Sequence, residues 1–74
     1  MVVVRRYSHD LEPGMMIRNQ SREDFRIGGV TTEGERIGVM AVNMTTGQFA
    51  EFDFDRHEFV KTVETDQPAS IVIR

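Results

Sequence analysis

Three residues at alternate positions near the end of the chain carry side chains that could do chemistry. Asp53, Asp55 and His57 would share one face of a strand, because strand side chains alternate between the two faces. Carboxylates and imidazoles ligate divalent cations and also serve in acid–base catalysis. A metal site normally draws ligands from more than one segment, and the sequence offers only His9 and Asp10 as distant candidates. We therefore expect a solvated strand face here, with no metal and no cofactor.

A second group, Ser8-His9-Asp10, contains the residue types of a catalytic triad. Triad members meet in space, however, and consecutive residues of an extended segment point in different directions. A chain of 74 residues also has little room for a deep pocket. We expect no catalytic residues, and hence a protein that is not an enzyme.

The third group is the arginines, which supply eight of the nine cationic side chains. Arginine favours planar, bidentate contacts with carboxylates and phosphates, although the bias could also be a compositional preference. Four arginines could converge into a basic stripe for nucleic acid, which we keep as the alternative function. Against it stand a pI of about 5.2 and nearby acids such as Glu23 and Asp24. Stacking on bases is left to Tyr7 and Phe49, because the other four phenylalanines are expected in the core. These are Phe25, Phe52, Phe54 and Phe59.

Size and composition limit how this chain can be stabilised. A domain of this length buries only about 60% of its unfolded surface, so its stability is expected to be marginal. The chain has no cysteine, which excludes disulfides and cysteine-based zinc sites and leaves oligomerisation as a further stabilising device. Hydrophobic residues make up 39% and charged residues 28%, as in a folded domain. No apolar run is long enough for a membrane span or a signal peptide, so we expect a cytoplasmic protein.

Alternation of apolar and polar residues, interrupted by glycine turns, predicts an all-β chain with no helix. Residues 36–43 are apolar on both faces, which is typical of a central strand. Gly28-Gly29 falls inside another strand and predicts a bulge. A 3₁₀ turn is expected at residues 55–57. The predicted body covers residues 11–64, with strands at 15–18, 25–32, 36–43, 48–55 and 59–63.

The order of these elements resembles an SH3-like small barrel. A Leu-x-Pro-Gly-Met turn at residues 11–15 opens the body, and the next three strands form a meander before the 3₁₀ turn and the last strand. The resemblance is one of pattern and carries no family motif. The aromatic ligand groove of SH3 domains is not recognisable, because the chain has no tryptophan and a single tyrosine. Proline-peptide binding therefore does not carry over from the resemblance. The length of 74 residues predicts a single small domain.

Two strongly β-prone arms, residues 2–7 and 70–74, flank this body. They could pair with each other in one sheet, exchange across a homodimer, or add to a strand of another protein. Such a small, acidic chain would suit a viral or bacterial modulator of a host protein, encoded by a phage or mobile element. We predict a non-catalytic protein-binding module, an adaptor or regulator. Its expected contact residues are Tyr7, Met15, Arg18, Arg22, Arg26 and Arg36, and its expected oligomer-forming residues are Val2, Val4, Ile71 and Ile73.

Overall fold

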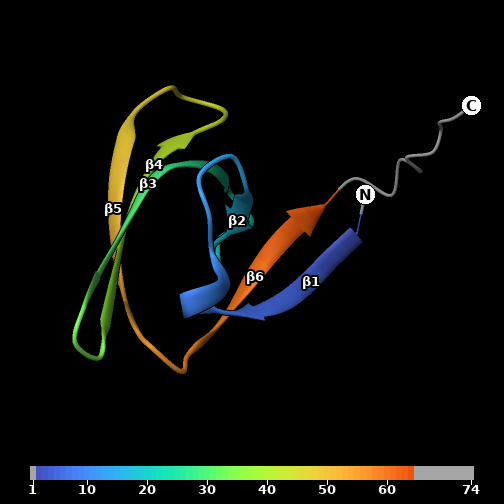
Figure 1. Ribbon diagram of the computed structural model, residues 1–74. Coiled ribbons are helices and arrows are strands. Elements are labelled where there is room, and N and C mark those ends of the chain that lie inside the picture. Colours follow the sequence, from blue (N-terminus) through green and yellow to red (C-terminus); the bar gives the residue numbers. More distant parts are fainter. Residues whose placement is uncertain (1, 65–74) are drawn as a thin grey trace, which may run out of the picture.

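The computed structural model describes residues 2–64, and these form a single antiparallel sheet (Figure 1). The strand order is β1-β6-β2-β3-β4-β5. The all-β prediction is confirmed for this part of the chain, and each predicted body strand is present to within about a residue at either end. The elements are β1 (Val2–Tyr7), η1 (Ser8–Asp10), β2 (Met16–Arg18), β3 (Asp24–Glu33), β4 (Arg36–Asn43), β5 (Phe49–Asp55) and β6 (Phe59–Glu64).

The prediction of a closed barrel is wrong, because the sheet stays open along β5. Within the described residues, β5 forms a ladder with β4 alone, and β1 with β6 alone. Figure 1 shows the cause: β5 and β6 leave their connecting turn as diverging strands, with β3, β4 and β5 on one side and β1 and β6 on the other. The short β2 links these two groups and pairs with only two residues of β6, Thr62 and Val63.

Most of the turn and bulge predictions are confirmed. Gly47 has φ +78° in the β4–β5 turn, a left-handed conformation that glycine adopts without steric cost. The same turn is held by Asn43, whose Oδ1 accepts hydrogen bonds from the backbone N–H groups of Thr45 and Thr46. The register of β3 against β4 shifts between Ile27 and Gly29, as expected for a bulge at the glycine pair.

The predicted 3₁₀ turn at residues 55–57 is wrong, since this segment is an ordinary turn between β5 and β6. The Asp55 side chain accepts a hydrogen bond from the His57 N–H, and the Glu58 N–H donates to the Asp55 carbonyl. These two bonds close the turn without a helical repeat. The 3₁₀ element forms at Ser8–Asp10 instead, where the Leu11 N–H donates to the Ser8 carbonyl.

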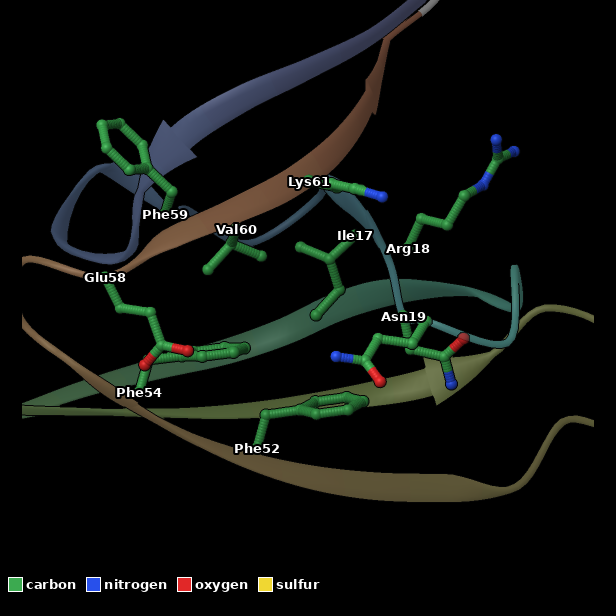
Figure 2. Close-up of a pocket in the computed structure, with 10 residues that line it drawn as sticks. Ile17, Arg18, Asn19, Phe52, Phe54, Glu58, Phe59, Val60 and Lys61 are labelled. Carbon is green, nitrogen blue, oxygen red and sulfur yellow. The ribbon is translucent and has the colours of Figure 1, made fainter.

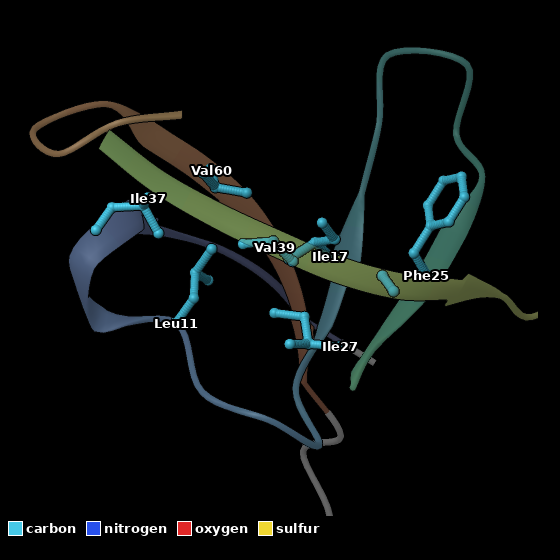
Figure 3. Packing of buried hydrophobic residues seen from close by; sticks show 8 residues of the cluster. Leu11, Ile17, Phe25, Ile27, Ile37, Val39 and Val60 are labelled. Carbon is cyan, nitrogen blue, oxygen red and sulfur yellow. The ribbon is translucent and has the colours of Figure 1, made fainter. Parts of the chain in front are cut away.

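The core lies on the concave face of the sheet, which we call the inner face (Figure 3). β4 supplies its centre through Ile37, Val39 and Ala41, all almost completely buried. Their neighbours on β2 and β3 alternate in the same way, and on β6 Val60 and Thr62 do so, although the next residue, Val63, is buried as well. The remaining members of the cluster are Leu11, Ile17, Phe25, Ile27 and Val60.

Candidate protein-binding edge and groove

Where the sheet fails to close, a groove lies between β5 and β6, and we call it the β5 groove (Figure 2). Phe52 and Phe54 line it from β5 and are only half-buried, with parallel rings whose centroids are 6.0 Å apart. Figure 2 shows these rings facing Ile17 and Val60 across the groove. Its volume is about 240 Å³, below the range of roughly 300–1,000 Å³ that small-molecule pockets occupy. The groove can take one or two apolar side chains, but it is too small for a drug-sized ligand.

The half-burial of the two phenylalanines corrects the prediction that both belong to the core. The alternation of β5 was predicted correctly, since Ala50, Phe52 and Phe54 face inward and the acidic residues face outward. Phe52 also makes an edge-to-face contact with the buried Phe25, with ring centroids 5.0 Å apart. The inner face of β5 therefore packs on the core from one side, and no strand of residues 2–64 lies over it on the other.

Beside the groove, β5 presents backbone groups on an edge that no strand of residues 2–64 covers, and we call it the free edge. The Asn43 N–H donates to the Gln48 carbonyl, and the Arg56 N–H donates to the Glu35 carbonyl. These two bonds identify the hydrogen-bonded pairs at the two ends of the β4–β5 ladder. Because bonded and non-bonded pairs alternate in antiparallel ladders, Ala50, Phe52 and Phe54 bond to β4. The free edge consequently carries the N–H and C=O groups of Phe49, Glu51 and Asp53. The next N–H, that of Asp55, donates to Glu58 Oε1.

A column of stacked rings lies on the opposite, outer face of the sheet. Tyr7 stacks between Phe59 and His9, with ring centroids 4.5 Å and 5.1 Å away. The prediction of a core Phe59 is wrong, because 55% of this residue is exposed and its ring points away from the groove in Figure 2. The signal in the sequence was Lys61 two positions later, since alternate strand residues share a face and a lysine marks it as solvated.

The predicted contact residues lie in several separate places. Tyr7 belongs to the ring column, and Met15 is half-buried against the core. Arg26 stands opposite Val42 on β4, six positions from Arg36, so these two arginines are about 20 Å apart. Arg22 is exposed in the β2–β3 loop with φ +64°.

Two of the predicted arginines are already engaged by carboxylates. Arg18 Nε lies 2.7 Å from Asp24 Oδ1, and Arg36 Nη2 lies 3.0 Å from Asp53 Oδ2. The hydrogen bond from Arg18 lowers the pKa of the Asp24 carboxyl, and Asp24 in turn raises the pKa of Arg18. Hydrogen bonding to Asp53 likewise raises the pKa of Arg36. The structure does not bring the four arginines together into one stripe.

An unexpected basic pair lies on β1 and β6. Arg5 and Lys61 stand directly opposite each other, an arrangement of like charges that destabilises a sheet. In the described part of the chain, neither residue forms an ion pair. The outer face is therefore basic at the β1 end, whereas at the β5 end it carries Glu51, Asp53 and Asp55.

The residues singled out for chemistry have structural roles. Ser8 is fully buried, and its hydroxyl donates to the Asp55 carbonyl, which joins the N-terminal 3₁₀ turn to the end of β5. Asp53 pairs with Arg36, while the His57 ring lies 3.9 Å from Glu35 on the surface. Among residues 2–64, no three histidine, aspartate or glutamate side chains gather in a way that could hold a metal ion.

Two of the four predicted oligomer-forming residues lie within residues 2–64, and two lie outside them. Val2 and Val4 belong to β1, whose pairing with β6 places the N-terminal arm within the sheet of one chain. Ile71 and Ile73, with the rest of the arm at 70–74, lie outside the described residues.

Comparison with known proteins places this chain in no family. No family model matches the sequence, and no curated protein matches it. Within the described residues there is no helix with the length and apolar character needed to cross a membrane.

Proposed function

We propose that this protein is a non-catalytic protein-binding module that accepts an extended segment of another protein along the free edge of β5. The proposal rests on the free edge of β5 together with the half-buried Phe52 and Phe54 beside it. Strand addition of this kind gains affinity from main-chain hydrogen bonds and specificity from alternate side chains that enter pockets. Strands β2 to β5 form a meander, and β6 returns to lie beside β2. This strand order supports the SH3-like resemblance for residues 11–64, as a barrel that is open on one side.

Selection of peptides from a random library tests this proposal without a known partner. Peptides enriched on the wild-type protein should lose about tenfold in affinity for the Phe54→Ser variant, because a buried phenyl ring contributes about 1.5–3 kcal/mol. The matched control is Phe49→Ser on the outer face of the same strand, where the ring is 79% exposed. That variant should lose less affinity than Phe54→Ser, because its ring lies on the outer face and outside the β5 groove.

Circular dichroism of both variants checks that each remains folded. The proposal is overturned if no peptide is enriched over an empty support. It is equally overturned if the enriched peptides bind the Phe54→Ser and Phe49→Ser variants alike, since binding then does not use the β5 groove.

Nucleic-acid binding is the second candidate, and a different surface supports it. The Arg5–Lys61 pair lies next to the exposed Tyr7–Phe59 stack, so basic and stacking side chains adjoin on the outer face. Single-stranded nucleic acids bind to surfaces of this kind, with phosphates on the cations and bases on the rings. The test is fluorescence anisotropy of labelled oligonucleotides at increasing salt. Binding that weakens steeply with salt and is lost in Phe59→Ala would support this candidate; no binding at about 50 mM salt would remove it.

A further inference from the structure

The two free edges of the sheet carry opposite charges. On the outer face, β1 presents Val3, Arg5 and Tyr7, and β5 presents Phe49, Glu51 and Asp53. Within residues 2–64, these are also the residues whose backbone groups bond to no neighbouring strand. The Ser8 N–H donates to the Glu58 carbonyl, so the alternate β1 residues Arg6, Val4 and Val2 bond to β6.

Strand directions allow one edge to meet the other between two copies of the chain. The strands formed by residues 2–64 alternate in direction, and their number is even. β1 of a second copy, placed beside β5 with the same face outward, therefore runs antiparallel to it. The hydrogen-bonding groups of the two edges then face each other while the inner and outer faces stay continuous.

One register joins opposite charges and apolar side chains at once. With Arg5 opposite Glu51, Tyr7 stands opposite Phe49 on the outer face. On the inner face of the same register, Val4 and Val2 stand opposite Phe52 and Phe54. Cross-strand aromatic pairs and opposite charges both stabilise sheets, and the valines would cover the β5 groove.

We infer that copies of this chain associate head to tail, with β1 of one copy added to the β5 edge of the next. This inference rests on the proposed function, since it uses the same edge and groove. Symmetric contacts are disfavoured: β1 against β1 brings the arginines of both copies together, and β5 against β5 brings Glu51 and Asp53 onto their own counterparts. Head-to-tail contacts add further copies to a growing chain, unless the chain closes into a ring.

Charge reversal at the two edges tests the inference. Light scattering over a range of concentrations should show a wild-type mass that rises with concentration beyond that of a dimer. The variants Arg5→Glu and Glu51→Lys should each need at least about fivefold more protein for the same mean mass, and the double variant should recover. The matched control is Arg26→Glu, which makes the same charge change on the central strand β3 and should resemble wild type.

Misfolding does not explain the expected result for Arg5→Glu, because that change replaces a repulsive pair with Lys61 by an attractive one. A mass that stays monomeric at every concentration overturns the inference, as does a double variant that fails to recover. So does a loss in Arg26→Glu equal to that in Arg5→Glu. If the protein is monomeric while selected peptides still bind at the β5 groove, the proposed function stands and only the self-association falls.

Discussion

β4 and β5 are neighbouring strands with similar apolar alternation and very different surroundings. The inward side chains of β4 are covered on both sides, by β3 and β5, whereas those of β5 are covered by β4 alone. Ile37 is completely buried as a result, and Phe54, its directly paired neighbour, is only half-buried. Apolar alternation thus specifies which face of a strand points inward, and the next strand along decides whether that face becomes core or binding surface.

Truncation of one inward side chain in each strand tests whether β4 and β5 differ in burial. Ile37→Ala should lower the free energy of unfolding by about 2–5 kcal/mol, because it opens a cavity in the centre of the core. Phe54→Ala removes a larger side chain but should cost only about 1–2 kcal/mol, since its ring is only partly buried. Urea unfolding of both variants gives the two values. A larger loss for Phe54→Ala would show that β5 is covered in solution.

The end of β5 is joined to the N-terminal segment by a hydrogen bond from the Ser8 hydroxyl to the Asp55 carbonyl. Ser8→Ala should cost about 1–2 kcal/mol, because it removes the hydrogen bond to the Asp55 carbonyl within a fully buried site. The same urea titration measures it, with Thr45→Ala as a control hydroxyl in the exposed β4–β5 turn. Equal losses in the two variants would contradict the structural role of Ser8.

The β1 edge offers a smaller effect with the opposite sign. Arg5→Glu should raise the free energy of unfolding of the monomer by about 0.2–1 kcal/mol, as a like-charge pair becomes an opposite-charge pair. Dilute protein is needed for this measurement so that self-association does not contribute. A destabilised variant would indicate that Arg5 has a favourable partner in the monomer, contrary to its position opposite Lys61.

The smallest predicted effect is a pH dependence in the β2–β3 hairpin. Asp24 has a pKa below its usual value of 3.8 because Arg18 hydrogen-bonds to its charged form. The ion pair contributes its full stability at pH values above 3.8. This stability is lost as the pH falls from 3.8 through the lower pKa that Asp24 has in the folded state. Thermal melts of wild type and Asp24→Asn should therefore converge as pH falls below about 4. A constant difference down to pH 2 would contradict this assignment.

Local patterns in the sequence predicted the elements well, because they depend on neighbouring residues. The Gly28-Gly29 bulge and the alternation of β5 follow from steric freedom and a period of two, which are both visible in the sequence. The barrel was mispredicted because closure depends on how far β5 and β6 diverge, a property of the whole sheet. The apolar residues within a single strand do not show how far two strands diverge.

The site was less predictable than the fold for a related reason. The sequence shows that Arg18 and Arg36 are cationic but not that Asp24 and Asp53 already neutralise them, since the second pair joins residues 17 positions apart. Tyr7 was predicted as a contact residue, but its partner Phe59 was assigned to the core on residue type alone. Lys61 on the same face would have corrected that assignment.

The most direct test of the open β5 edge is amide hydrogen exchange, measured residue by residue by NMR on dilute protein. The N–H groups of Phe49, Glu51 and Asp53 should exchange much faster than those of Ala50, Phe52 and Phe54, which bond to β4. Alternation along β5 would show an edge that is free to accept a strand. Equal protection at all six positions would mean that the edge is covered, and it would contradict both the open sheet and the binding site built on it.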